Sequence, residues 1–534
     1  KPKGRKSLKI FAIVFIILLC IVLAASWYVS CYLETRLHKT LTEQVDKQTN
    51  GLYTLTINKL SIELKKGVLH LCDITLQADS TKRLIDSIKS NLFFTANSID
   101  LKIGKIYKLL KSNDIDIKYI TIKSPQLFIN KHENDSLINF GTLNGTSRTK
   151  FNKITIDKIN ITNGKFTYKN NNIPKLLVDK LNLEIASVLI DSNFMANNKI
   201  PDYESITIHT DSIQYLFSKD NFTLSVNQFT LNTSDSLLIL DTLSIIPVYG
   251  KNEFAQKTGI DYTTLKTGTI RLTGFDKNKI MSYKGIFADS LYINNVDAFS
   301  YKNKKLPLNR KTKLLFHQMV QQIPVPLSIH HVNIKNGRGE YEELGAEAQT
   351  SGNVYFTDIH GIIDGLTNIT SAEKQVFTFD AHAKLYGEGQ IDAVFKFPVS
   401  PQYDHFEVKG TLGGMRMLQA NKMATPLANI HIASGTAKHI DYSITGNSHQ
   451  THLDMLFLYN DLDIDLLKTK KNGKKKTDNF LSAIANAFVI LNDNPTSIND
   501  PRRVKTTTPA DNKRSNFNYL WRTMRDGIKA TFGL

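Results

Sequence analysis

The sequence is poor in cysteine and tryptophan, and each shortage narrows the class of protein. Three cysteines cannot build a disulfide framework. Cys20 lies in an apolar run, Cys31 just after it, and Cys72 in a segment that alternates like a strand, so we interpret all three as structurally incidental. Two tryptophans stand against 20 tyrosines and 28 phenylalanines, a balance that favours a β-rich protein.

Motifs for catalysis and metal binding are also missing from the sequence. The run Gly410–Gly414 lacks the Lys and the Ser or Thr of a phosphate-binding loop, and there is no Cys-x-x-Cys or His-Glu-x-x-His. His330 and His331 are adjacent, and His449 and His452 are three apart, so on strands each pair would face opposite sides. Carboxylates are spread through turns and polar faces, with no pair placed as acid and base. We therefore expect no catalytic residue, no metal ligand and no cofactor, and we expect that the protein is not an enzyme.

The charge is strongly positive. A net charge of +18 requires an acidic partner or a basic tail. Lysines crowd residues 468–476, which supplies such a tail, so nucleic acid is not expected as a partner. Hydrophobic content of 41% with 22% charged residues excludes global disorder. The 534 residues suffice for several domains or for one extended repetitive domain.

The N-terminal segment has the pattern of a membrane anchor. A basic cluster in residues 1–9 precedes the uncharged run Ile10–Val29, which is long enough to span a bilayer core. Trp27 and Tyr28 lie where an aromatic belt is expected, and the basic cluster predicts a cytoplasmic N-terminus. A cleaved signal peptide, or a lipoprotein signal ending at Cys31, is the alternative. The candidate anchor residues are Ile10, Phe11, Phe15, Leu18, Ile21, Leu23, Trp27 and Tyr28.

One sequence pattern occurs twice, at Ile156–Tyr168 and at Ile329–Tyr341, as I-x-x-[IV]-N-I-x-N-G-x-x-x-Y. Asn163-Gly164 can adopt the positive φ angles of a two-residue hairpin turn, so the pattern predicts a strand, a tight turn and a return strand. A slip in the alternation at Asp157-Lys158 predicts a β-bulge. One face of the hairpin is apolar and the other polar, which predicts a sheet wetted on one side. Looser versions of the pattern occur at Ile117–Ile129 and Leu291–Tyr301.

Changes of hydrophobic period divide the chain into successive regions. The expected order is a basic N-terminus (1–9), a transmembrane helix (10–29), a helical stalk (30–51), a first β lobe (52–305), a connecting helix (306–326), a second β lobe (327–467), a basic flexible linker with a short helix (468–515) and an amphipathic helix (516–534). The apolar residues of the last helix are Phe517, Leu520, Trp521, Met524, Ile528 and Phe532. This helix has two open uses, packing against the β body and lying on anionic lipid.

A single N-terminal anchor followed by many β segments and repeats without catalytic residues resembles the AsmA-like family of bacterial envelope proteins. The resemblance spans about residues 5–467 and rests most on Ile323–Gly337 with Tyr341-Glu342. The run Gly410–Gly414 followed by Ile430–Gly435 is also similar to the late part of such proteins. The closing helix is similar to the tail of versions from Bacteroidota.

The resemblance implies a mainly β fold with one N-terminal transmembrane helix. It further implies long curved antiparallel sheets that form an open β-groove in two lobes, a short connecting helix and C-terminal helices. The protein would be a single-pass protein of the inner membrane with its bulk in the periplasm. It would assist phospholipid transfer between inner and outer membranes, or outer-membrane assembly.

An apolar face without a second layer needs an apolar guest. The expected partners are phospholipid acyl chains, the inner membrane, and outer-membrane or envelope assembly proteins. The candidate lipid-contacting residues are Ile154, Ile156, Ile159, Ile161, Phe166, Ile329, Val332 and Ile334. A scaffold protein with closed, dry β-sandwich cores is the alternative from another class, and an envelope enzyme with unrecognised residues is a third.

Overall fold

The computed structural model describes most of the chain after residue 32. The described residues are 33–49, 51–63, 66–79, 91–104, 114–131, 153–191, 201–307, 312–370, 375–469, 475–477, 491–496 and 500–533. The protein is mainly β, with 61% strand and 16% helix. Contacts within the chain define two units. The first comprises residues up to Phe217 with Leu224–Leu240, and the second comprises Ser218–Thr223 with Asp241–Leu534. The segment 306–326, predicted to join two lobes, lies within the second unit.

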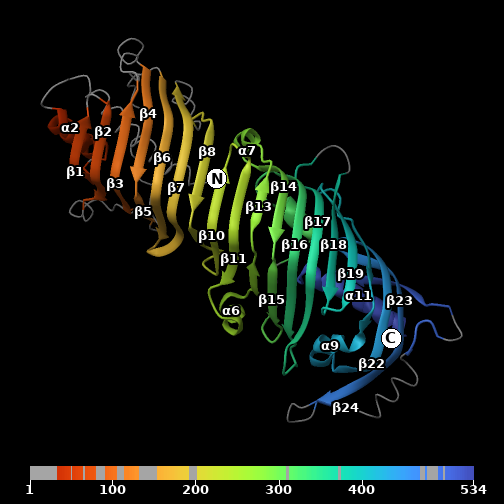
Figure 1. The fold of residues 1–534 in the computed structure, drawn as a ribbon. Helices are drawn as coiled ribbons and strands as arrows, with labels where there is room; N and C mark the ends of the chain where they lie inside the picture. Colours follow the sequence, from red (N-terminus) through yellow and green to blue (C-terminus); the bar gives the residue numbers. More distant parts are fainter. Residues whose placement is uncertain are drawn as a thin grey trace. The chain divides into compact units, whose positions relative to one another are not determined.

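The first unit holds one described helix and a run of strands that follow one another across the sheet (Figure 1). Two positions in the sheet are each filled by two short strands, β4 with β5 between β3 and β6, and β8 with β9 between β7 and β10. These are α2 (Leu33–Gln48), β1 (Tyr53–Glu63), β2 (Val68–Ala78), β3 (Asn91–Ile103), β4 (Asp114–Lys123), β5 (Gln126–Lys131), β6 (Lys153–Asn170), β7 (Ile173–Asp191), β8 (Ser205–Thr210), β9 (Ser212–Phe217) and β10 (Phe222–Asn232).

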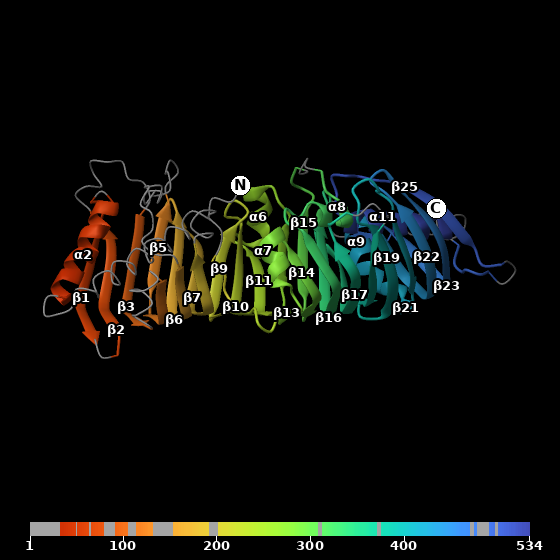
Figure 2. The ribbon, with the colours of Figure 1, turned by 90° about the horizontal axis from the view of Figure 1, so that it is seen from above.

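The second unit continues in the same manner, with short helices between strands (Figure 2). Its elements are β11 (Leu237–Pro247, which belongs to this unit from Asp241 onward), α6 (Lys251–Thr258), β12 (Tyr262–Lys266), β13 (Ile270–Thr273), α7 (Lys277–Tyr283), β14 (Ile286–Asn294), β15 (Asp297–Asn303), α8 (Phe316–Gln321), β16 (Leu327–Leu344), β17 (Gly352–Thr367), β18 (Val376–Leu385), β19 (Gly389–Pro398), β20 (Phe406–Leu412), β21 (Met415–Arg416), η1 (Met417–Ala420), α9 (Asn421–Ala428), β22 (Ile430–Gly446), β23 (Gln450–Thr469), β24 (Lys475–Thr477), β25 (Arg503–Pro509) and α11 (Asn516–Phe532).

The sheet in each unit is mixed, and not antiparallel throughout as the sequence led us to expect. In the first unit β4 and β5 both run parallel to β6, and the other registered neighbours are antiparallel. In the second unit β14 and β15 both run parallel to β16, after which the pairing from β16 to β20, β22, β23 and β25 is antiparallel. A parallel neighbour requires a crossover connection, which hydrophobic period alone does not reveal.

The repeated pattern does not form hairpins. Asn163-Gly164 lies inside β6, and Asn336-Gly337 lies inside β16, each a single strand of 18 residues. Asn163 and Asn336 do have positive φ, 54° and 55°, but the chain bends there and continues. The neighbouring strand supplies hydrogen bonds across the bend, from the Ser124 amide to the Thr162 carbonyl (2.8 Å) and from the Lys165 amide to the Pro125 carbonyl (2.7 Å). The hairpin prediction was therefore wrong, because the same left-handed backbone also serves a β-bulge.

Bends of this kind line up across the first unit. Asp73, Ser124, Asn163 and Lys180 lie at matching levels of neighbouring strands, and each has a φ between 48° and 54°. Asn, Asp and Ser tolerate this conformation because their short polar side chains bond locally. The alternation of faces changes phase at each bend, so aliphatic residues on both sides of it stay on one face.

At Asp157-Lys158, where the sequence predicted a β-bulge, the alternation of side chains between the two faces changes in β6 and in its neighbour β7 at the same level. The register of β6 against β7 is the same before and after it, with Ile156 opposite Val188 and Lys158 opposite Ala186. Ser187, opposite the slip, has a φ of 53°. Ile154 and Ile156 belong to the buried cluster, and Ile159 and Ile161 pack against it, so the four isoleucines share one face as predicted.

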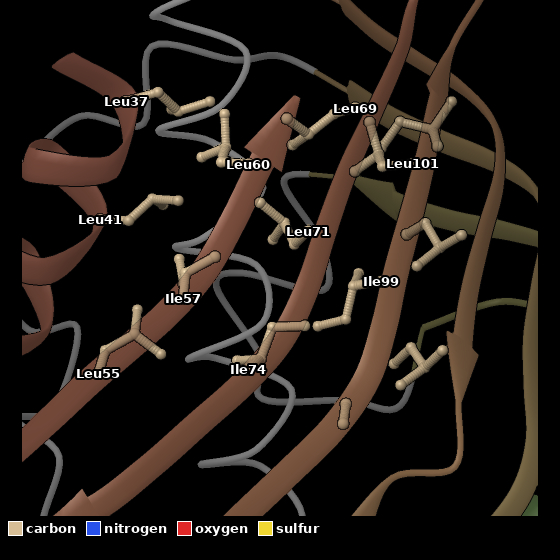
Figure 3. Packing of buried hydrophobic residues seen from close by; sticks show 14 of the residues in the cluster. Leu37, Leu41, Leu55, Ile57, Leu60, Leu69, Leu71, Ile74, Ile99 and Leu101 are labelled. Carbon is tan, nitrogen blue, oxygen red and sulfur yellow. The ribbon is translucent and has the colours of Figure 1, made fainter. Parts of the chain in front are cut away.

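Helix α2 covers the first strand of the sheet. The helical spacing of Leu37, Leu41 and Val45 correctly predicted a helix, but it is not a free stalk. Leu37 and Leu41 are 1% and 0% exposed and point at the aliphatic side chains of β1 and β2 (Figure 3). The imidazole of His38 adds a 2.9 Å hydrogen bond from Nε2 to the Ile57 carbonyl. The helix thus supplies the second layer for this end of the unit.

The expected inner-membrane localisation is contradicted. The candidate anchor residues, Ile10 to Tyr28, lie outside the described residues. In the part of the chain that the structure describes, no helix is both long and apolar enough to cross a membrane. The helix nearest the apolar run, α2, is amphipathic and packs its leucines on the sheet.

The predicted flexible linker contains the last strand. Arg503–Pro509 forms β25, antiparallel to β23, where the sequence predicted a flexible linker. Asn494 is 0% exposed and its side-chain amide donates to the carbonyls of Phe457 (2.5 Å) and Arg502 (3.0 Å). The alternating Val and Thr residues of 503–509 favour a strand, and pairing with β23 stabilises it.

Candidate functional site

An unbroken row of aliphatic side chains crosses the sheet of the first unit. Each member is the direct cross-strand partner of the next, and such partners share one face of a sheet. The row runs Leu60, Leu71, Ile99, Ile122, Ile161, Leu183, Ile208 and Leu231, from β1 to β10. We call this set the aliphatic row.

Burial changes along the aliphatic row. The members on β1 to β4 are at most 9% exposed, and Ile122 is only 2% exposed. From Ile161 onward the members are half-buried. At the buried end of the row, α2, the helix that the structure describes in the first unit, packs on β1. The same chemistry therefore makes a closed core at one end and an accessible apolar face at the other.

A second set of apolar residues extends this face beyond the aligned bends. Leu127, which packs against the buried cluster, is the partner of Phe166, and Phe166 is in turn the partner of Val178. Val178 then faces Ile213, and in the next row Leu176 faces Tyr215, which is 45% exposed. We call the half-buried residues of β6 to β10 in both sets the open face. It is lined by hydrocarbon on both sides of the bend.

The predicted lipid-contacting residues divide between the core and the accessible surface. Ile154, Ile156, Ile329 and Val332 are buried at 5% exposure or less, so they are core residues. The remaining four candidates, Ile159, Ile161, Phe166 and Ile334, are half-buried. Sequence reasoning missed Leu183, Ile208 and Leu231, although each alternates with polar neighbours as Ile161 does. Their register with the repeat could not be read from one strand.

The histidines are arranged differently from the prediction. His330 and His331 do not face opposite sides, because the alternation changes phase between the buried residues Ile329 and Val332. Their side chains are 68% and 66% exposed, and His331 Nδ1 lies 2.7 Å from Asp364 Oδ1. His449 and His452 are also both exposed. Within the described ranges, no three or more His, Cys, Asp or Glu residues are grouped to hold a metal ion.

Helix α11 packs on the second unit through a face that the sequence did not single out. Tyr519, Thr523, Gly527 and Thr531, four apart, are buried on β23 and β25. The Thr451 and Thr523 hydroxyls lie 2.6 Å apart, and the Thr508 hydroxyl donates to Asp526 (2.8 Å).

Of the predicted apolar stripe on α11, only Phe532 is buried. The other five residues are half-buried: Phe517, Leu520, Trp521, Met524 and Ile528. Phe517 reaches Tyr341, with ring centroids 5.4 Å apart. Small residues four apart are the signal that identifies the contact face, since they allow close approach.

Comparison with known proteins does not assign the chain to a family. No protein-family model matches the chain, and no match is found among curated proteins.

Proposed function

We propose that the open face of the first unit binds acyl chains of phospholipids. The protein would thereby carry phospholipid between membranes or support assembly of an outer membrane. The observation that supports this most is the aliphatic row itself. Its members Ile161, Leu183, Ile208 and Leu231 continue a buried core and have no covering layer among the described residues, and a water-exposed apolar face of this kind usually marks a binding surface.

The physical chemistry of the open face suits a hydrocarbon guest. From Ile161 to Leu231 the row spans three strand spacings, about 14 Å in all. Each methylene group that leaves water for such a surface contributes about 0.8 kcal/mol. Binding of this kind depends on buried area and needs no catalytic residue. We accordingly propose a non-enzymatic role.

A photo-crosslinking experiment in living bacteria tests this function with the full chain. The variants Leu183→benzoylphenylalanine and Ile208→benzoylphenylalanine place the reactive group on the open face. Glu184→benzoylphenylalanine and Thr207→benzoylphenylalanine are matched controls, because these exposed neighbours lie on the opposite face of the same strands. In cells labelled with radioactive phosphate, we expect labelled phospholipid adducts at Leu183 and Ile208 and none at the controls. Equal labelling at all four positions, or none at any, would contradict the proposal.

A scaffold with closed cores is the second candidate, and two observations favour it. Helix α2 closes the core over β1, and α11 closes the inner face of β23 and β25. If the open face is likewise covered in the cell by protein, Leu183→benzoylphenylalanine and Ile208→benzoylphenylalanine will form protein adducts and no phospholipid adduct.

A further inference from the structure

Exposed apolar side chains gather at one end of the strands of the second unit. We call this set the apolar rim: Tyr283 (65% exposed), Ile286 (40%), Met319 (46%), Ile369 (41%), Val376 (49%) and Tyr403 (40%). Large side chains of this kind usually face inward, so their collection at one edge points to a contact that the described residues do not make with one another.

Strand register places the first part of the apolar rim. Ile286 begins β14 and is the partner of Leu327, which begins β16. The Asn368 amide donates to the Leu327 carbonyl (3.2 Å), which brings Ile369, just after β17, to the same end. Tyr283 ends α7 and lies against Phe287, with ring centroids 5.8 Å apart. Figure 1 shows α7 at the end of the sheet where β14 begins.

The rest of the rim follows along the same edge. Val376 begins β18 and is the partner of Pro398, which ends β19. Tyr403 lies in the turn to β20, where its amide donates to the Ser400 carbonyl (3.1 Å). The side chain of Gln321 on α8 donates to the carbonyls of Pro398 and Val399 (3.3 and 3.2 Å), which holds Met319 of the same helix at this edge.

The charge beside Tyr283 is positive. Lys277, Lys279 and Lys284 flank it, and the side chain of Lys279 is 58% exposed, with its Nζ 4.0 Å from Asp276 Oδ2. The nearby carboxylate of Asp276 caps α7 by accepting from the amides of Asn278 (2.9 Å) and Lys279 (3.0 Å). The rim therefore combines exposed hydrocarbon, two tyrosines and a local excess of lysine.

We propose that the apolar rim docks on the surface of an anionic lipid bilayer. Tyrosine favours the bilayer–water interface because its ring is apolar and its hydroxyl is polar. Lysines beside it reach lipid phosphates, each contributing about 1 kcal/mol near an anionic surface. The apolar residues lie at successive strand ends and turns. A fluid bilayer surface can contact such an arrangement, because lipids adjust their positions and no complementary protein surface is needed. This surface belongs to the second unit and does not depend on acyl binding by the first.

Photo-crosslinking to vesicles tests the docking surface with the full chain. Val376→benzoylphenylalanine places the reactive group on the rim, and Asp380→benzoylphenylalanine, on the same strand with the Asp380 side chain 56% exposed, is the control. With phosphatidylglycerol vesicles we expect lipid adducts at Val376 and none at Asp380, and with phosphatidylcholine vesicles we expect weak labelling at both. Adding Lys279→Gln and Lys284→Gln should weaken vesicle binding through the rim by roughly 30-fold, from about 1 kcal/mol per lysine.

Three results would overturn the proposal. A covalent dimer at Val376 would show that a second copy of the chain covers the rim. Equal lipid labelling at Val376 and Asp380 would show that another part of the chain brings the protein to the vesicle without orienting it. No lipid adduct at Val376 with either vesicle would show that the rim does not meet lipid. Labelling at Leu183 is measured separately, so failure of the rim and failure of the open face are distinguishable.

Discussion

At the scale of single residues, left-handed backbone positions set the course of the strands. Asp73, Ser124 and Asn163 bend neighbouring strands at one level and switch the phase of alternation there. Nearly all of them are polar residues of the kind found in turns, which explains why the sequence resembled hairpins. The residue type predicts the φ angle, but the hydrogen bonds of the adjacent strand decide whether the chain turns or only bends.

Asn163 offers a direct test of this interpretation. Asn163→Gly should leave the free energy of unfolding nearly unchanged, because glycine adopts positive φ without strain. Asn163→Val should destabilise the protein by about 1–2 kcal/mol, because a β-branched side chain crowds the left-handed conformation. Chemical denaturation of the variants measures the difference. Equal stability of the two variants would show that the bend does not constrain residue 163.

The aliphatic row provides a matched pair of substitutions for burial. Ile122→Ala removes a side chain that is 2% exposed and should cost about 2–5 kcal/mol. Ile208→Ala, in the same row on the open face, should cost much less because the wild-type side chain is already partly hydrated. Chemical denaturation of both variants measures the loss in free energy of unfolding. A large loss for Ile208→Ala would mean that something covers the open face.

At the scale of elements, helix α11 depends on small side chains. A Cβ on Gly527 would lie 2.3 Å from Leu453 Cδ2 and 2.9 Å from Met455 Cε. The helix is therefore held by close approach to β23 at Gly527, together with the ring contacts that Phe517 and Phe532 make near its two ends.

Gly527→Ala should loosen α11 at a cost of about 1–3 kcal/mol, because the added methyl group overpacks the contact with β23. The expected readout is faster proteolysis near the C-terminus. Lys529→Ala, at an exposed position of the same helix, is the control and should behave as wild type. If both variants resist protease equally, the close approach at Gly527 does not determine how firmly α11 packs on β23.

The same helix should respond to alkaline pH. Burial raises the pKa of Tyr519 to about 12, and its hydroxyl donates to the Asn447 carbonyl (3.0 Å). A raised tyrosine pKa adds stability that is present below about pH 10 and is lost as the pH rises through about 12. Helix α11 should therefore loosen in this interval, and Tyr519→Phe should reduce the pH dependence there. Proteolysis at pH 9 and 11.5 compares the two proteins, and identical profiles would contradict the assignment.

At the scale of the whole molecule, the same alternation of apolar and polar residues gives a buried core in one part of the sheet and an accessible apolar face in another. Ile120 of β4 and Ile154 of β6 belong to the buried cluster, whereas Leu183 and Ile208 are half-buried, and no helix of the described first unit packs on them. Function in this proposal follows from the presence or absence of a second layer.

Paired aspartate substitutions distinguish the buried core from the open face. Leu183→Asp with Ile208→Asp should leave the circular dichroism spectrum β-rich and abolish phospholipid adducts from Leu231→benzoylphenylalanine. Ile154→Asp with Ile156→Asp should instead unfold the core, because both side chains are almost completely buried. Retained phospholipid adducts in the first variant would show that the open face is not the binding surface.

The sequence by itself determined that the protein is mainly β, that Ile154, Ile156, Ile159 and Ile161 share an apolar face, and that residues near Leu37 and near Met524 form helices. These are local properties, since period and residue type act within a few positions of the chain. Only the tertiary structure decided that Asn163 bends a strand, that β4 and β6 are parallel, that α2 packs on the sheet and that α11 is held by Gly527. Each of these depends on which distant segment supplies a hydrogen-bond partner or a covering surface, and that information is not contained in any single stretch of sequence.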